Sequence, residues 1–102
     1  MRVWYHLAMS ERLNTDQIDE ALTALPGWEA RDDALHHVIT VDGYRPAVAL
    51  AVRIAMEAEA ANHHPDLLLT WGRLEITLTS HDAGGITERD VALARTIAEL
   101  PR

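Results

Sequence analysis

The chain has 102 residues, of which 48% are hydrophobic and 25% charged, and it carries a formal net charge of -7. These values are typical of one soluble globular domain, which we expect to cover residues 1–102. We expect it not to bind nucleic acid directly, because such binding depends on cationic side chains that neutralise phosphates. We expect it not to span a membrane, because no apolar run reaches about 18 residues. The chain has no cysteine, which excludes disulfides and cysteine-based zinc sites and fits a protein of the reducing cytoplasm.

The first part of the chain predicts a leader, one helix and two strands. Residues 1–13 form a short leader that matches no recognised motif and could be poorly ordered. Asn14 and Gln17 have the spacing of a helix capping box, and apolar residues follow at helical intervals until Pro26-Gly27 ends the helix. Two short strands are then expected, at residues 28–32 and 35–41.

The longest predicted helix covers residues 44–61. From residue 47 onward it carries only three charged residues, which are Arg53, Glu57 and Glu59, so that it is apolar nearly all round. A helix that only covers a sheet needs a single apolar stripe. We therefore expect a second buried face against another copy of the chain, although an alanine-rich helix whose small side chains tolerate water would have the same pattern.

Two further strands follow the long helix. Residues 67–70 form the first of them. In the second strand, apolar and polar residues alternate from Leu74 to Thr79. This alternation is typical of a sheet with one buried face.

The last helix is expected after Gly84-Gly85 and ends at about Leu100, with Thr87 and Asp90 at the N-cap and N3 positions. The order of elements is thus helix, two strands, helix, two strands, helix. It predicts an α+β fold, with a four-stranded, mainly antiparallel sheet that is covered on one face by helices.

The hairpin of the last two strands brings together the three histidines His63, His64 and His81. If Gly72-Arg73 form the turn, His81 lies opposite His64; if Trp71-Gly72 form it, His81 lies opposite Asn62. Neighbouring strands are only about 4.8 Å apart. In either register, therefore, the three imidazoles can converge on one small ligand.

Such a cluster has three interpretations. Imidazole titrates near pH 6.5, so one histidine can donate a proton while another accepts one. Three neutral imidazoles and a water would also make a catalytic zinc centre, although adjacent His63 and His64 diverge unless the backbone turns sharply. The pair could instead be polar residues that end a helix, where a cation suits the dipole. The other adjacent pair, His36-His37, has its rings on opposite faces of a strand and is interpreted as structural.

Taken singly, Asp90 is typical of a helix cap, Glu59 of a solvated helix residue and Trp28 of core packing. Their spacing relative to the histidines, however, resembles the signature of the pterin-4a-carbinolamine dehydratases. That signature consists here of Glu59, His63-His64-Pro65, Trp71, His81 and Asp90. The segment SHDAGGITERDVALA (80–94) is similar to the family's THDxGGLTxxDxxLA segment, and LPGW (25–28) resembles its LxGW element. Together the matches extend from about residue 18 to residue 99.

The resemblance implies the fold predicted above and the dehydration of 4a-hydroxytetrahydropterin to quinonoid dihydropterin, without a metal or redox cofactor. It implies that His63 and His81 transfer protons and that His64 mainly holds the pterin. Further residues at family positions that contact the pterin, border the pocket or support the histidines are Asn62, Ser80, Trp28, Glu59 and Asp90. The family also implies a homodimer or homotetramer that is formed through the helix at 44–61.

The chain departs from the family pattern in its aromatic residues. It has no phenylalanine, and VDGYRPAVAL (41–50) stands where an FxDFxxAxxF-like pattern is expected, so the pocket wall and the oligomer packing are expected to differ. The alternative function is a catalytically weak, dehydratase-like protein-binding or assembly module, because the family includes a protein that binds a transcription factor's dimerisation domain. The presence of all three histidines favours the enzyme.

Overall fold

The computed structural model describes residues 11–102, and residues 1–10 of the expected leader lie outside the described residues. The elements are α2 (Thr15–Leu22), β1 (Glu29–Arg31), β2 (Ala34–Thr40), α3 (Tyr44–Ala60), β3 (Asp66–Thr70), β4 (Arg73–Leu78), the 3-10 helix η1 (His81–Ala83) and α4 (Glu88–Glu99). The predicted order of helices and strands is therefore confirmed. The last residue of the expected leader is tied to the domain, because the Leu13 N–H donates to the Ile86 carbonyl at 2.8 Å.

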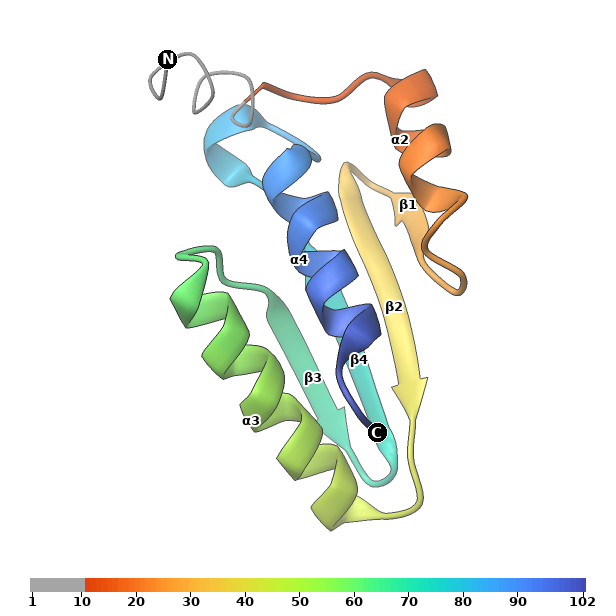
Figure 1. Cartoon of the computed structure of the whole chain (residues 1–102), viewed down its shortest axis with the longest axis vertical. Helices are drawn as coiled ribbons and strands as arrows, with labels where there is room; N and C mark the ends of the chain where they lie inside the picture. The colour runs from red at the N-terminus through yellow and green to blue at the C-terminus, as the bar shows by residue number, and fades with distance from the viewer. Residues whose placement is uncertain (1–10) are drawn as a thin grey trace.

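The strands form one antiparallel sheet in the order β1-β2-β4-β3. The helices lie on one face of it, with α4 over the centre and α3 beside β3 (Figure 1). In β4 the side chains of Leu74, Ile76 and Leu78 are buried, whereas the intervening ones are partly exposed. This alternation was predicted from the sequence, and it shows that one face of the sheet forms the core.

The hairpin has the second of the two possible registers, since Thr70 pairs with Arg73 and the turn is Trp71-Gly72. Gly72 has φ +69, and a Cβ there would approach the Val41 carbonyl oxygen to 3.0 Å. A glycine is thus required where this turn lies against the end of β2. At the other hairpin, Asp32 and Asp33 both have positive φ, as a two-residue turn of type I′ requires.

Both predicted capping boxes are present. Asn14 and Gln17 exchange side-chain and backbone hydrogen bonds at the start of α2, and Thr87 and Asp90 do the same at the start of α4. These boxes fix where the two helices begin. The box on α4 is also part of the candidate site described below.

Helix α3 has two apolar faces. Ala47, Leu50, Ile54 and Ala58 are buried against the rest of the chain. A second apolar stripe is exposed, and within it Val52 is 56% and Met56 69% exposed. The stripe predicted from the sequence is therefore uncovered in the single chain. Among residues 11–102 there is no helix with the length and apolarity that crossing a bilayer would demand.

Candidate active site

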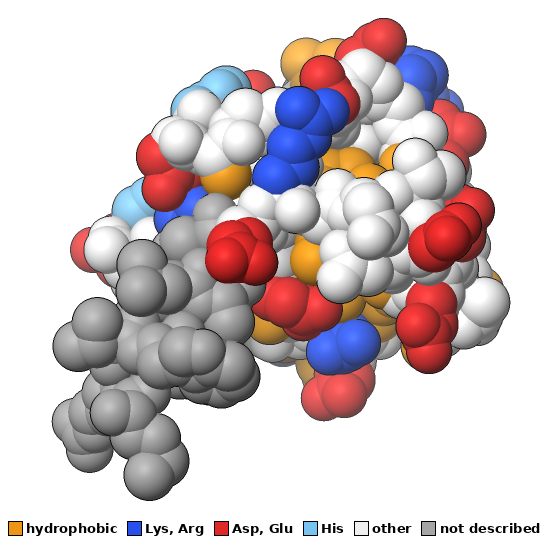
Figure 2. Space-filling model, turned by 90° about the horizontal axis from the view of Figure 1, so that it is seen from above, with side chains coloured by type: hydrophobic (Ala, Val, Ile, Leu, Met, Phe, Trp, Pro, Cys, Tyr) orange, Lys and Arg blue, Asp and Glu red, His pale blue; other side chains and the backbone are white. Residues whose placement is uncertain are grey.

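The three histidines that the predicted hairpin brings together, His63, His64 and His81, line one pocket. The pocket has a volume of about 380 Å³ and lies where the end of α3 meets the segment after β4. Its lining residues are Asn62, His63, His64, Thr79, Ser80, His81 and Asp82. Figure 2 looks onto this end of the molecule and shows histidine side chains exposed among acidic ones. Asn62 and Ser80, which were predicted as substrate contacts, thus lie beside the histidines, whereas Thr79 and Asp82 were not predicted.

A left-handed residue at the end of α3 lets two adjacent histidines take different environments. Asn62 has φ +51, its N–H donates to the Glu59 carbonyl, and the next N–H, that of His63, donates to the Ala58 carbonyl at 3.0 Å. These two bonds are the Schellman pattern of a helix C-terminus. The chain therefore reverses before the histidine pair, so that His63 is buried and His64 is exposed.

The left-handed turn leads to a stability prediction. Asn62→Ala is expected to destabilise the fold by about 1 kcal/mol, because a Cβ without a local hydrogen-bonding group is disfavoured at positive φ. Asn62→Gly is expected to be nearly neutral, since glycine adopts this conformation freely. Urea denaturation of the two variants measures the difference, and equal stability of both would contradict a strained turn at this position.

His63 is paired with a buried carboxylate. Its Nε2 lies 2.5 Å from Oδ1 of Asp90, whose side chain is 0% exposed. Oδ2 of Asp90 accepts hydrogen bonds from the Ser80 hydroxyl at 2.8 Å and the Thr87 N–H at 2.9 Å. An ionised carboxylate only accepts hydrogen bonds, so Nε2 of His63 carries the proton and Nδ1 is left as the basic nitrogen.

His64 has a carboxylate partner of a different kind. Its Nε2 lies 2.8 Å from Oε1 of Glu59, and the two side chains are 59% and 79% exposed. Water screens such a pair, whereas the buried pair of His63 and Asp90 is held in one geometry. The two adjacent histidines are thus constrained to very different degrees.

His81 lies on η1, in a short loop that is closed at its base. Ser80 and Gly85 form a two-way backbone bridge, and Gly84 adopts the left-handed conformation at the end of η1. Arg89 of α4 donates to Asp82 at 2.8 Å, which joins the loop to the helix. Arg89 was missed by the sequence analysis, although it stands next to Asp90 and the acidic Asp82 follows His81 directly.

The ion pair between Arg89 and Asp82 has a measurable electrostatic effect. The hydrogen bond from the Arg89 guanidinium holds the pKa of Asp82 below its ordinary value. Because this pKa is depressed in the folded state, the pair stabilises the fold above the unfolded pKa, and that stabilisation is lost as the pH falls through the folded pKa. Arg89→Met is therefore expected to raise the pKa of Asp82 towards about 3.9, as followed by carboxyl carbon NMR. In the control Arg31→Met, which removes a pair with Glu29, the pKa of Asp82 should not move.

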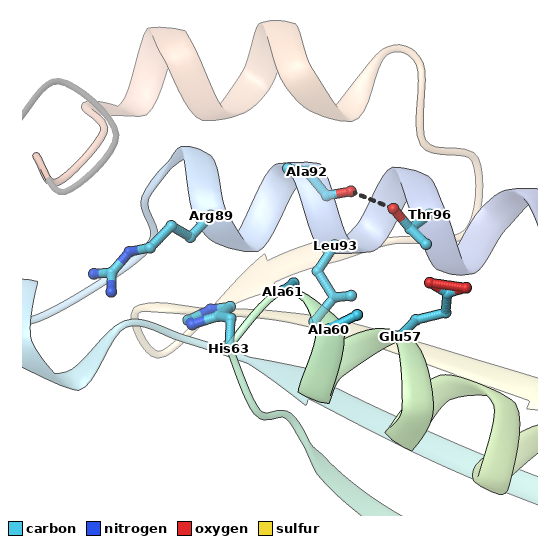
Figure 3. Close-up of a pocket in the computed structure, with 8 residues that line it drawn as sticks. All are labelled: Glu57, Ala60, Ala61, His63, Arg89, Ala92, Leu93 and Thr96. Carbon is cyan, nitrogen blue, oxygen red and sulfur yellow. Dashed lines mark hydrogen bonds between the residues drawn. The ribbon is translucent and has the colours of Figure 1, made fainter. Parts of the chain in front are cut away.

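A second cavity borders His63 on its other side. This groove between α3 and α4 has a volume of about 290 Å³, and its lining residues are Glu57, Ala60, Ala61, His63, Arg89, Ala92, Leu93 and Thr96. Figure 3 shows His63 and Arg89 at one end of it and Glu57 facing Thr96 at the other. His63 therefore belongs to the walls of both cavities.

Trp28 is the predicted site residue that the structure places apart from the histidine pocket. Its side chain is 6% exposed, belongs to the core and stacks on the ring of His37 with centroids 4.8 Å apart. His37 also bonds to the Gly27 carbonyl, and His36 bonds to the Arg31 carbonyl and the Thr77 hydroxyl. A contact of Trp28 with a substrate stays a prediction.

A metal site at the histidines would need a cluster of ligating side chains, and the described part of the chain contains none. Within residues 11–102 there is no group of at least three His, Cys, Asp or Glu side chains arranged to hold a metal ion. His63 and His64 each face a carboxylate with Nε2, and they face different ones. The divergence of adjacent side chains that the sequence predicts is thus present in the structure.

Comparison with known proteins identifies the family. The family model "Pterin 4 alpha carbinolamine dehydratase" matches residues 11–100. A protein of Thermomicrobium roseum is 47% identical over 87% of this chain and 96% of its own length, and one of Thermosynechococcus vestitus is 41% identical over 90% and 97%. Both bear the name "Putative pterin-4-alpha-carbinolamine dehydratase".

A solved structure gives the same result. The crystal structure of a "transcriptional coactivator/pterin dehydratase" from Brucella melitensis superposes with a TM-score of 0.83 at 31% identity, over 86% of this chain and 96% of that one. The resemblance first noted in the sequence is therefore confirmed over nearly all of the described residues. The chain belongs to the pterin-4a-carbinolamine dehydratase family.

Proposed function

We propose that the protein is a hydro-lyase of the cytoplasm that dehydrates 4a-hydroxytetrahydropterin to quinonoid dihydropterin by histidine acid–base catalysis, and so takes part in recycling a pterin cofactor. The observation that carries this proposal is the buried pair of His63 and Asp90, of which His63 lines a pocket together with His81. A general base needs a fixed orientation and a free ring nitrogen, and this pair supplies both. Membership of the family supports the choice of a pterin as substrate.

The reaction requires two proton transfers. The C4a hydroxyl leaves as water when an acid protonates it, and a base removes a proton from the pterin ring, so that the electrons of that bond form the new double bond. We assign the base to Nδ1 of His63, because its Nε2 is committed to Asp90. We assign the acid to His81, which faces the same pocket from η1. Both steps use side chains of this chain and no metal or redox cofactor.

In this proposal the remaining site residues either contact the substrate or support the side chains that do. His64 contacts the pterin and is steadied by Glu59. Asn62 lines the pocket directly. Ser80 is also among the lining residues, and its hydroxyl donates to Asp90. Trp28 stacks on His37 in the core, and its contact with the substrate stays a prediction.

Direct measurement of dehydration tests the function. In stopped flow, the wild type is expected to accelerate the conversion of 4a-hydroxytetrahydropterin well above its spontaneous rate. The same rate with and without protein would refute the enzyme. A parallel sample that has been treated with a chelator should keep its full activity, and a loss of activity that zinc restores would replace the acid–base mechanism by a metal-dependent one.

We further propose that the exposed stripe on α3 is covered by another copy of the chain, which gives a homodimer or homotetramer. Val52 and Met56 lie on this stripe, and neither contributes to the core of the single chain. Val52→Lys is expected to shift the mass in light scattering to that of a smaller species, because a desolvated ammonium opposes the interface. The matched control is Val38→Lys on the open face of the sheet, which should leave the mass unchanged. A monomeric wild type at micromolar concentration would contradict this assembly.

The second candidate function is a catalytically weak protein-binding or assembly module. It is favoured by the exposed stripe on α3, which could face another protein, and by the similar protein of Brucella melitensis, which is described as a transcriptional coactivator as well as a pterin dehydratase. The kinetic experiment separates the two functions. A turnover at the spontaneous rate together with an intact fold would favour the module.

A further inference from the structure

Three buried polar side chains behind His63 form a network that extends beyond the histidine and its carboxylate. Ser80, Thr87 and Asp90 are each at most 1% exposed. They come from two parts of the fold: Ser80 follows β4, whereas Thr87 and Asp90 are the N-cap and the N3 residue of α4. Buried polar groups need hydrogen-bond partners, and these three residues are hydrogen-bonded to one another.

The direction of each hydrogen bond follows from the count of protons. A hydroxyl has a single proton. The Ser80 hydroxyl gives its proton to Oδ2 of Asp90, so towards Oγ1 of Thr87, at 2.8 Å, it can only accept. The Thr87 hydroxyl is therefore the donor in that contact. Its oxygen accepts in turn from the backbone N–H of Arg89 at 3.2 Å.

The hydrogen bonds thus converge on Asp90, with a chain of donors from the N-terminus of α4 on one side and Nε2–H of His63 on the other. The Arg89 N–H donates to Thr87, Thr87 donates to Ser80, and Ser80 donates to Oδ2 of Asp90. The Thr87 N–H donates to Oδ2 as well. Since both donors meet the same oxygen, the carboxylate is oriented with Oδ1 towards Nε2 of His63. Hydrogen bonds in such a chain polarise one another in a buried environment.

We infer that Thr87 and Ser80 are positioning residues for His63: through Asp90 they keep the imidazole in its Nε2–H tautomer, with Nδ1 free to accept a proton from the substrate. The tautomer concerns the free protein, and its use in proton transfer rests on the proposed dehydratase function. The inference also changes the role of Ser80, whose hydroxyl serves the buried network rather than the pterin ring. Thr87 is more than a helix cap, because its hydroxyl donates to Ser80 and so holds the Ser80 proton on Asp90.

The test compares two substitutions at one position. Thr87→Ser keeps a hydroxyl, whereas Thr87→Val replaces it by a methyl group. At a pH where the ring of His63 is neutral, long-range proton–nitrogen NMR should show only the Nε2–H tautomer in the wild type and in Thr87→Ser. In Thr87→Val it should show a mixture of the two tautomers. We expect kcat of Thr87→Val to fall about 10- to 100-fold with KM little changed, as is typical when a partner that orients a histidine is removed.

Two further variants separate the network from the cap. Ser80→Ala breaks the hydroxyl relay but leaves the N-cap in place, and the same mixed tautomers are expected; this variant carries the test if Thr87→Val does not fold. Asn14→Ala removes the matched capping box on α2 and should leave the tautomer and kcat unchanged. A pure Nε2–H tautomer and wild-type kcat in both Thr87→Val and Ser80→Ala would overturn the inference. Because NMR needs no substrate, this result is independent of the dehydratase assay.

Discussion

Replacement of His63 by alanine is expected to lower kcat for dehydration of 4a-hydroxytetrahydropterin by about 10²- to 10⁴-fold, the usual contribution of a general acid or base, down to the spontaneous rate at most. The reason is that Nδ1 of His63 is the only nitrogen in the proposed mechanism that a buried carboxylate holds ready as a base. Stopped-flow kinetics at saturating substrate measures the change. His81→Ala should give a loss of the same order, because the leaving hydroxyl then lacks its acid.

His36→Ala is the matched control for the His63 variant. It also removes a hydrogen-bonded histidine, but one that lies on the sheet and outside the pocket. Its kcat is expected to equal that of the wild type. If His63→Ala retained more than half of the wild-type kcat while His81→Ala was inactive, the base would have to be assigned elsewhere.

Asp90→Asn is expected to destabilise the fold by about 1–3 kcal/mol, the usual cost of leaving a buried hydrogen-bonding group without its partner, and also to lower kcat. The amide has one oxygen and one NH₂ group, whereas the donors around Asp90 come from His63, Ser80 and Thr87. If the NH₂ group takes the place of Oδ2, it faces the donors of Ser80 and Thr87. If it takes the place of Oδ1, Nε2 of His63 must accept instead of donate, and Nδ1 then carries the proton and is no longer a base. Urea denaturation gives the change in the free energy of unfolding, and kinetics below the transition gives kcat.

Glu59→Gln provides the comparison for the Asp90 variant. It changes the carboxylate partner of the neighbouring histidine, His64, but in a pair that is largely exposed. Its effect on the free energy of unfolding should be within about 1 kcal/mol. Similar losses of stability in the two variants would mean that burial does not distinguish the two carboxylates, and the division of roles between His63 and His64 would lose its basis.

Much of the fold could be predicted from local patterns. The alternation from Leu74 to Thr79 fixed the buried face of β4, and the two capping boxes fixed the starts of α2 and α4. These features depend on residues close in sequence, so the chain itself contains the information. The register of the hairpin was left open between two turns, because both contain Gly72 and only its contact with the end of β2 decides between them.

The sequence predicted which residues meet at the candidate site but not how their side chains are arranged. The spacing brought His81 to His63 and His64, but it could not place the reversal of the chain at Asn62, since asparagine also adopts ordinary conformations. Arg89 and Thr87 were not recognised as parts of the site. Their partners Asp82 and Ser80 lie seven residues away, in a loop whose path depends on packing against α4.

The sequence by itself determined the elements, the apolar faces and the family of this protein, because these follow from short-range periodicity and from a spaced motif. Only the tertiary structure decided which histidine is a buried partner and which an exposed one. His63, which follows the end of α3, is buried where it contacts Asp90 at the start of α4, 27 residues further along the chain. Two identical side chains in adjacent positions acquire different chemistry from that contact, since the environment, and not the residue type, determines what an imidazole does.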